Sequence, residues 1–360
     1  MFYKSVLFYI LLLSVLYITI HSRKREYYNN YKSIVVTPQS TIYKNLTIST
    51  WHNSSLYVNL ANNLSGLFPI ANIVKTGGSV ENIYNVEKSK NMLGLVQDDT
   101  LYNYAKENPN TNVRYITMLG LEQITAITLA NSNINSWNDI KNKRIGTFGL
   151  DSGSYKTLDR ILSISRDLRT NQIVSIDIDN NGDSIIKKLV NKEIDLFFGI
   201  VSNPDPIFNT ISKKYPIKIL GVDGIDTRLL KIALPYYRDA IIDTTEYKVV
   251  SSKTIHTLQT GISLICHKEL DPLDSYLLIK TLFGNFSYIK NNGDNTYKSQ
   301  MFEFSPTYLY NVNYSVDLHS GIRKYLKDIN LITTNSNEDC IYKVGIEPCK
   351  IKYTNSYRLL

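Results

Sequence analysis

The fold is decided by residues 71–82, which read ANIVKTGGSVEN. Residues 71–75 are typical of a short strand, and residues 76–79 form a Gly/Ser turn before a helix. Ser79 is predicted to cap this helix, with Glu81 in the first turn, where its charge suits the helix dipole. The first N–H groups of such a helix lack intrahelical partners, and glycines let a ligand approach the backbone. The stretch therefore predicts a cradle for a carboxylate or a similar anion.

A second stretch, residues 145–154 (IGTFGLDSGS), has the same design. A strand over 145–149 leads into Asp151, Ser152, Gly153 and Ser154, and then into a helix with one apolar stripe. A single turn of this kind favours plain helix capping. Two such turns in one chain make a shared ligand site an equal alternative.

Beyond residue 45, short apolar runs alternate with helical patterns, which is typical of an α/β protein with mostly parallel, buried strands. Separate strands are predicted over residues 113–118, 124–129 and 261–266, among others. The 360 residues exceed one average domain, so one bilobal domain or two smaller domains are expected. The sequence shows no internal repeat, which excludes a solenoid or a propeller.

Composition and charge exclude several classes of protein. With 43% hydrophobic and 20% charged residues, the chain is not disordered, collagen-like or a many-span membrane protein. The formal charge of +8 would suit an anionic partner. However, Lys and Arg are dispersed outside residues 23–25, and the abundance of Tyr, Asn, Ile and Lys is typical of a gene rich in A and T. No nucleic-acid partner is expected.

Enzyme signatures are absent from the sequence, including phosphate loops, dinucleotide fingerprints, zinc-protease helices and hydrolase nucleophile elbows. The five histidines are scattered singly, so no catalytic residue, metal ion or cofactor is predicted. Cys266 is predicted to be buried, and Cys340 and Cys349 are close enough to form a disulfide in an oxidising compartment. The strand-end carboxylates that could meet in space are Asp98, Asp99, Asp151 and Asp205.

Residues 5–20 are uncharged and mostly apolar, and a basic cluster follows them at residues 21–25. This pattern is typical of a signal peptide or a transmembrane anchor, to which residues 1–22 are assigned. The absence of a small-residue cleavage site favours an uncleaved anchor. The basic cluster after the apolar run instead favours a cytoplasmic position for the rest of the chain. Residues 23–44 are polar and are expected to be a linker.

Several motifs resemble the TRAP-associated extracytoplasmic immunogenic (TAXI) family of solute-binding proteins. Residues 76–83 (TGGSVENI) are close to a signature of that family, and residues 93–98 (LGLVQD) follow at its spacing. Further similar segments follow in the family's order, and the resemblance covers about residues 46–328. These segments are residues 124–144, 152–154, 193–204, 264–273 and 318–321.

The resemblance implies a two-lobed periplasmic-binding-protein-like α/β fold of type II, whose lobes close over a small molecule. It places lobe one at residues 45–126 and 262–330, lobe two at 127–261, and a tail at 331–360. It also implies an extracytoplasmic protein without enzyme activity that binds a small carboxylate or an amino acid, such as glutamate, for a TRAP-type membrane permease. The ligand-binding residues implied by the resemblance are Tyr57, Thr76, Gly78, Ser79 and Gln97 in lobe one, and Ser152, Gly153, Ser154, Asn203 and Pro204 in lobe two.

The sequence departs from the family pattern at two turns. Bulky Trp51 and His52 stand where the family has glycines, which predicts a narrower pocket or a different ligand. Asp151 replaces a glycine and would repel an anion unless its side chain turns outward. These departures support a second hypothesis, in which the chain is a membrane-anchored sensor or interaction module that keeps the fold without transport.

Overall fold

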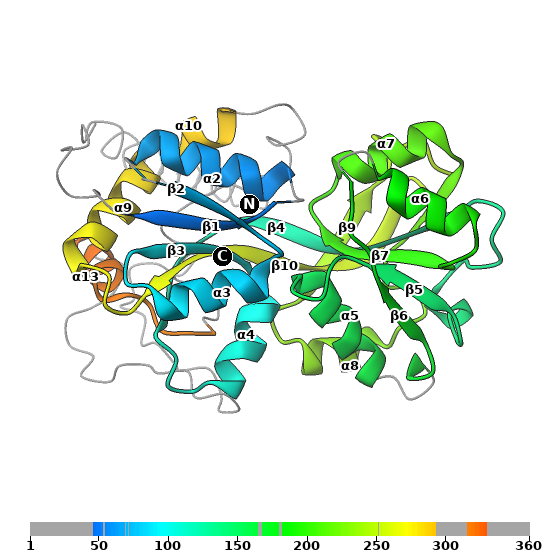
Figure 1. The fold of residues 1–360 in the computed structure, drawn as a ribbon, viewed down its shortest axis with the longest axis horizontal. Coiled ribbons are helices and arrows are strands. Elements are labelled where there is room, and N and C mark those ends of the chain that lie inside the picture. The colour runs from blue at the N-terminus through cyan, green and yellow to red at the C-terminus, as the bar shows by residue number, and fades with distance from the viewer. Residues whose placement is uncertain are drawn as a thin grey trace, which may run out of the picture.

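The chain folds into two α/β lobes joined by a pair of crossing strands (Figure 1). The structure is a computed structural model that describes residues 46–292 and 315–329, except residues 53–54, 69, 71, 165–167, 180–181 and 251. The predicted signal or anchor at 1–22, the linker, Cys340 and Cys349 lie outside the described residues. No helix within the described residues is long and apolar enough to cross a membrane.

Lobe one contains three parallel strands in the order β2-β1-β3. Each strand is followed by a helix, as the alternation of apolar runs and helical patterns predicts. The C-terminal helices of the described chain also pack on this lobe (Figure 1). The elements are β1 (Thr47–Trp51), α2 (Ser55–Leu67), β2 (Asn72–Thr76), α3 (Ser79–Lys88), β3 (Met92–Gln97), α4 (Asp98–Glu107), α9 (Pro272–Gly284), α10 (Phe286–Asn291) and α13 (Ser320–Asp328).

Lobe two repeats this arrangement with parallel strands in the order β7-β5-β6. Strand β7 reads LFFGIV and is buried along its whole length, because helices cover both of its faces. The elements are η1 (Trp137–Asp139), β5 (Arg144–Thr147), α5 (Gly153–Ile164), β6 (Gln172–Ser175), α6 (Asp183–Val190), β7 (Leu196–Val201), α7 (Pro206–Lys214), β8 (Ile217–Leu220), α8 (Thr227–Ala233) and β9 (Arg238–Asp243).

Two antiparallel strands, β4 (Val113–Leu129) and β10 (Thr254–His267), run through both lobes. The beginning of β4 and the end of β10 pair with each other in lobe one, where β10 also pairs with β3. The other halves pair with β7, β8 and β9 in lobe two. The lobes therefore share one sheet of ten strands, with a parallel group of three strands in each lobe and antiparallel pairs wherever β4 or β10 takes part.

The prediction of separate strands over 113–118 and 124–129 is wrong. They are one strand of 17 residues, because residues 119–123 continue the ladder with β10. Gly120 pairs with Ile262, and Leu121 pairs with Gly261, at the point where the strands pass from one lobe to the other. Glycines at this crossing leave room for the backbone to bend.

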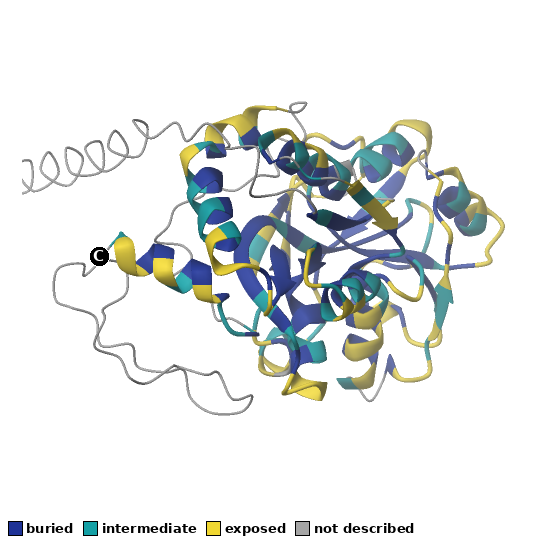
Figure 2. Cartoon of the chain, turned by 60° about the vertical axis from the view of Figure 1, so that its left-hand side comes forward, coloured by how far each residue is buried: buried dark blue, intermediate teal, exposed yellow. Residues whose placement is uncertain are grey.

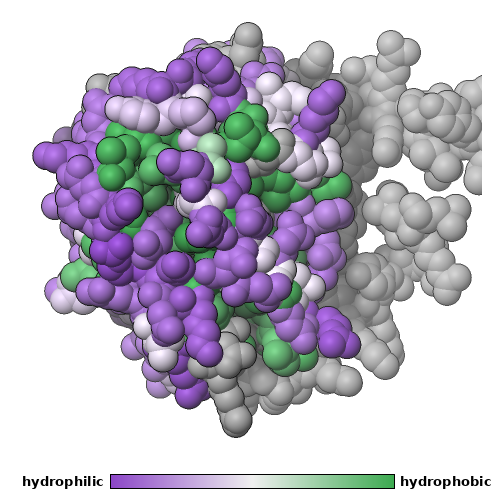
Figure 3. All heavy atoms as spheres, turned by 90° about the vertical axis from the view of Figure 1, so that its right-hand side faces the viewer, coloured by the Kyte–Doolittle hydropathy of each residue, from purple (hydrophilic) through white to green (hydrophobic). Residues whose placement is uncertain are grey.

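Burial follows the layers of the fold. The inner strands are buried, the edge strands β2, β6 and β9 are partly exposed, and the helices expose one side to solvent (Figure 2). Cys266 lies in β10 with 0% exposure, so the prediction that it is a core residue is confirmed. The outer end of lobe two is mostly hydrophilic, with apolar side chains in separate patches (Figure 3).

Candidate functional site

The two Gly/Ser turns identified in the sequence contact each other across the two lobes. The backbone N–H of Val80, in α3, donates a hydrogen bond to the carbonyl oxygen of Asp151 at 3.2 Å. Gly78 has a φ of +143°, and a Cβ added there would lie 2.8 Å from the Asp151 oxygen and from Cα of Ser152. Only glycine allows this conformation and this approach. The lobes therefore meet at the starts of α3 and α5.

The polar groups of the first turn are hydrogen-bonded within lobe one. Helix α3 begins at Ser79 with Gly78 as its N-cap, so the prediction that Ser79 is the cap is wrong. The Ser79 hydroxyl instead accepts a hydrogen bond from the backbone N–H of Gln97 at 3.0 Å, and it also hydrogen-bonds the side chain of Tyr57. Thr76 lies 2.6 Å from the Asn82 amide oxygen, to which its hydroxyl donates. This turn holds the strand ends of lobe one together.

The second turn caps its own helix and fits against lobe one. The Ser152 hydroxyl accepts from the backbone N–H of Tyr155 at 3.1 Å, and the Ser154 hydroxyl accepts from that of Ile200 at 2.8 Å. A Cβ at Gly153 would lie 2.6 Å from the amide oxygen of Gln97. A side chain at residue 153 would therefore displace the Gln97 amide, which hydrogen-bonds Asp99 and Thr157.

Asp99, the second residue of α4, is the polar centre of the contact between the lobes. Its carboxylate accepts hydrogen bonds from two lobe-two hydroxyls, Thr157 and Tyr237, the latter at 2.9 Å. It also accepts from the Gln97 side chain and from the Thr100 backbone N–H in lobe one. Burial raises the pKa of Asp99, and these hydrogen bonds oppose the rise. We call this set of hydrogen bonds the interlobe latch.

Asp98 and Glu122 are two further buried carboxylates near the lobe crossing. Burial raises the pKa of Asp98 to about 7; a hydrogen bond from Ser263 opposes this shift, and the neighbouring charge of Asp99 adds to it. Glu122 lies in β4 and accepts a hydrogen bond from the Tyr57 hydroxyl at 2.9 Å. Burial also raises the pKa of Glu122 well above its ordinary value. The charged forms of these carboxyl groups are therefore costly in the closed protein.

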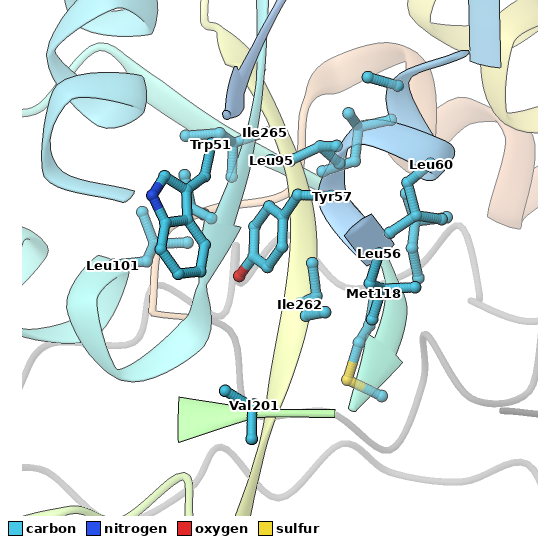
Figure 4. Close-up of a cluster of buried hydrophobic side chains, with 14 of the residues drawn as sticks. Trp51, Leu56, Tyr57, Leu60, Leu95, Leu101, Met118, Val201, Ile262 and Ile265 are labelled. Atoms are coloured by element: carbon cyan, nitrogen blue, oxygen red, sulfur yellow. The ribbon is translucent and has the colours of Figure 1, made fainter. Parts of the chain in front are cut away.

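Aromatic side chains fill the neighbouring space (Figure 4). Trp51, at the end of β1, packs edge-on against Phe148 of lobe two, with ring centroids 4.7 Å apart. The Trp51 ring also meets Tyr57 at 6.2 Å, and both rings are buried. Figure 4 shows the Tyr57 hydroxyl pointing toward Val201 of β7. Trp51, which stands where the TAXI family has a glycine, therefore lies between the lobes.

Comparison with known families decides the classification of the chain. Residues 56–329 match the NMT1-like family. The chain belongs to the NMT1-like family. The TAXI resemblance is finer than this match and stays a prediction. A search of curated proteins finds no match to this NMT1-like chain.

Three solved structures are similar to this NMT1-like protein at low sequence identity. A protein from Bordetella bronchiseptica is 9% identical, with 80% of this chain and 98% of that one covered and a TM-score of 0.49. A substrate-binding protein of an amino acid ABC transporter is 12% identical, with coverage of 68% and 96% and a TM-score of 0.45. An arginine-specific periplasmic binding protein from Salmonella typhimurium is 13% identical, with coverage of 69% and 98% and a TM-score of 0.45.

The ten residues expected to bind a ligand fall into two groups. The larger group gathers where the lobes meet: Tyr57, Thr76, Gly78, Ser79, Gln97, Ser152, Gly153 and Ser154. Asn203 and Pro204 lie after β7, where the Asn203 amide donates to Gln123 and Thr125 and accepts from the Tyr247 hydroxyl. Whether any of the ten contacts a ligand stays a prediction.

The sequence analysis missed Glu122, although a signal for it was present. Glu122 is the one charged residue between Tyr115 and Leu129, in the otherwise uncharged run that forms most of β4. A lone charge in such a strand indicates a buried polar contact or a function. In the part of the chain that the structure describes, no group of His, Cys, Asp or Glu is arranged to hold a metal ion.

Proposed function

We propose that this NMT1-like chain is an extracytoplasmic solute-binding protein that captures a small molecule between its lobes and presents it to a membrane transporter. The observation that carries the proposal is the interlobe latch, in which a carboxylate of lobe one is held by Thr157 and Tyr237 of lobe two. These contacts exist only when the lobes are closed. A protein whose closure is built from a few hydrogen bonds is suited to couple binding to a change of shape.

The proposed working cycle is opening and closing about β4 and β10. Opening breaks the latch and the contact between Val80 and Asp151, and bends the two strands near Gly120 and Gly261. A guest that contacts both lobes stabilises the closed form by its differential affinity for that form. No covalent step is part of this cycle, and the chain is proposed to act without a cofactor.

The finer parts of the proposal come from the TAXI resemblance. They are a TRAP-type permease as the partner, a small organic anion or an amino acid as the ligand class, and attachment to the membrane through residues 1–22. A neighbouring gene that encodes a large multi-span permease would support the transport partner, and the type of that permease would decide between TRAP and another class.

The decisive experiment measures melting of the full chain against a panel of amino acids, carboxylates and amines. A ligand at 100 times its dissociation constant stabilises the folded state by about 2.7 kcal/mol. Small-angle X-ray scattering with and without the ligand then measures lobe closure. Flat melting curves across the panel, for protein that is folded by circular dichroism, would contradict solute capture.

One observation favours a second candidate, a membrane-anchored sensor or interaction module without transport. Trp51 and Phe148 pack together between the lobes, and the Asp151 carbonyl occupies the N-terminus of α3, where a ligand anion is expected. Replacing both Ser79 and Ser152 with alanine separates the two candidates. The double variant is expected to lose ligand binding if the protein captures solutes, and to keep partner binding if it is an interaction module.

A further inference from the structure

The crossing of β4 and β10 contains a buried carboxylate with a hydroxyl group opposite it. Glu122 is 3% exposed and accepts a hydrogen bond from Tyr57. Thr260 pairs directly with Glu122 in the antiparallel ladder, so the two side chains lie on the same face of the sheet with their Cβ atoms about 5 Å apart. Thr260 is 1% exposed, and its hydroxyl has no hydrogen-bond partner in the structure.

An unpartnered hydroxyl at this depth is unusual. Buried polar groups are nearly always hydrogen-bonded, and leaving one without a partner costs free energy. Thr260 is therefore expected to have a partner in some other state of the protein. A guest that donates or accepts a hydrogen bond beside Glu122 would supply that partner.

Three carboxyl groups gather around this position, and a nearby cation would favour their ionised forms. Asp98, Asp99 and Glu122 are all buried; Asp99 raises the pKa of the other two, and Asp98 also raises that of Glu122. None of the ion pairs found among the described residues includes any of the three carboxylates. The one cation that acts on Asp98 is the exposed Arg238 of β9.

An anionic guest does not fit these surroundings. At the start of α3, the N–H of Val80 is already bonded to the Asp151 carbonyl. At the start of α5, the Ser152 hydroxyl accepts from the backbone N–H of Tyr155, the third residue of the helix. An added negative charge beside these three carboxyl groups would make their ionised forms still more costly, because like charges repel strongly in a medium of low dielectric.

We propose that the group bound at the lobe crossing is a positively charged one, an ammonium or guanidinium group of a small organic cation, held by Glu122 and Thr260. The Glu122 carboxylate accepts from the cation, and the Thr260 hydroxyl accepts a second of its N–H bonds. Hydrogen bonds between charged partners are the strongest class and give the site its selectivity. A positive charge at this position would also stabilise the ionised forms of the buried Asp98 and Asp99 carboxyl groups.

This inference rests on the proposed function, and it changes the ligand class that the TAXI resemblance implies. An amino acid with a basic side chain or a diamine satisfies it. A dicarboxylate or glutamate does not.

The test compares probes of different charge on the full chain. L-Lysine, L-arginine and putrescine serve as cations, L-glutamine as a neutral side chain, and L-glutamate and succinate as anions. Isothermal titration calorimetry is expected to show binding of at least one cation at least tenfold tighter than binding of every anion. Preferred binding of an anion would overturn this inference and leave solute capture intact. Absence of binding by every probe would overturn both.

Variants then assign the binding to the site. Glu122→Gln keeps the shape and removes the charge, and it is expected to weaken cation binding at least tenfold. Thr260→Val removes only the hydroxyl and is expected to weaken binding severalfold. Glu193→Gln, in an exposed ion pair with Lys188 of lobe two, is the matched control and is expected to bind as the parent does.

A further measurement on the wild-type protein tests the site even if one of these variants folds poorly. Binding of a cation beside a carboxyl group favours its charged form, so wild-type binding is expected to release protons, which titrations in buffers of different ionisation enthalpy measure. Cation binding that is unchanged in both Glu122→Gln and Thr260→Val would overturn the assignment.

Discussion

Removing the Tyr237 hydroxyl is expected to shift the protein toward its open form. In Tyr237→Phe, Asp99 loses one of its two lobe-two donors, the one at 2.9 Å, and Thr157 remains. A hydrogen bond contributes about 1 kcal/mol when both partners are neutral and about 1.5–3 kcal/mol when one is charged. The closed form is therefore expected to lose about 1–3 kcal/mol relative to the open form, which is about fivefold to over a hundredfold in the ratio of the two.

Two measurements check this prediction. Small-angle X-ray scattering of the full chain without ligand is expected to give a larger radius of gyration for Tyr237→Phe than for the parent. Chemical denaturation is expected to show a loss of stability of at most the same about 1–3 kcal/mol, because the latch contributes to the folded state only while the lobes are closed.

A matched control separates the latch from a general effect of the substitution. Tyr84 lies on α3 and is 53% exposed, so Tyr84→Phe is expected to leave both measurements unchanged. A Tyr237→Phe protein with the parent's radius of gyration and the parent's stability would refute the role given to the latch.

Three further predictions concern other parts of the contact between the lobes. Gly78→Ala is expected to destabilise the protein by about 1–3 kcal/mol in chemical denaturation, because a side chain is strained at the φ of +143° found there. Gly149→Ala is the control, because nothing lies within 4 Å of the added Cβ and the packing is little affected. Because burial raises the pKa of Asp98 to about 7, the folded state binds the Asp98 proton more tightly than the unfolded state does. The free energy of unfolding is therefore expected to fall as pH rises from about 4 to 7, by up to about 1.4 kcal/mol per pH unit. Asp98→Asn should remove this contribution in denaturation curves measured across that pH range. Trp51→Ala is expected to cost about 3–5 kcal/mol of stability, against less than about 0.5 kcal/mol for Leu229→Ala at a side chain that is 52% exposed; equal costs for the two would contradict the packing described.

Local elements could be predicted from the sequence because their causes are local. A Gly/Ser turn between an apolar run and a helical pattern is encoded within about ten residues, and the structure has α3 and α5 at the two places expected. The cap of α3 was misplaced by one residue. Ser79 forms a hydrogen bond with the backbone of Gln97, a partner 18 residues away that no local pattern reveals.

The site depended on contacts between the lobes, which the sequence does not encode locally. The sequence predicts cradles with free N–H groups at the Gly/Ser turns, but in the structure the Asp151 carbonyl accepts from the N–H of Val80, the second residue of α3. That contact depends on how β4 and β10 orient the lobes. The same holds for Asp99, which was identified as a strand-end carboxylate, although its partners Thr157 and Tyr237 are far along the chain.

The path of the chain through β4 and β10 makes lobe two a continuous insertion into lobe one. The chain leaves lobe one along β4 and returns along β10, and Gln123 and Gln259 are direct partners in the ladder. The entry and exit of the inserted segment are therefore about 5 Å apart, on adjacent strands. Such a segment can be replaced as one unit, because its two ends join neighbouring positions on β4 and β10. The part of the ligand-contacting surface on lobe two can thus change in sequence while lobe one, which carries both ends of the described chain, stays constant.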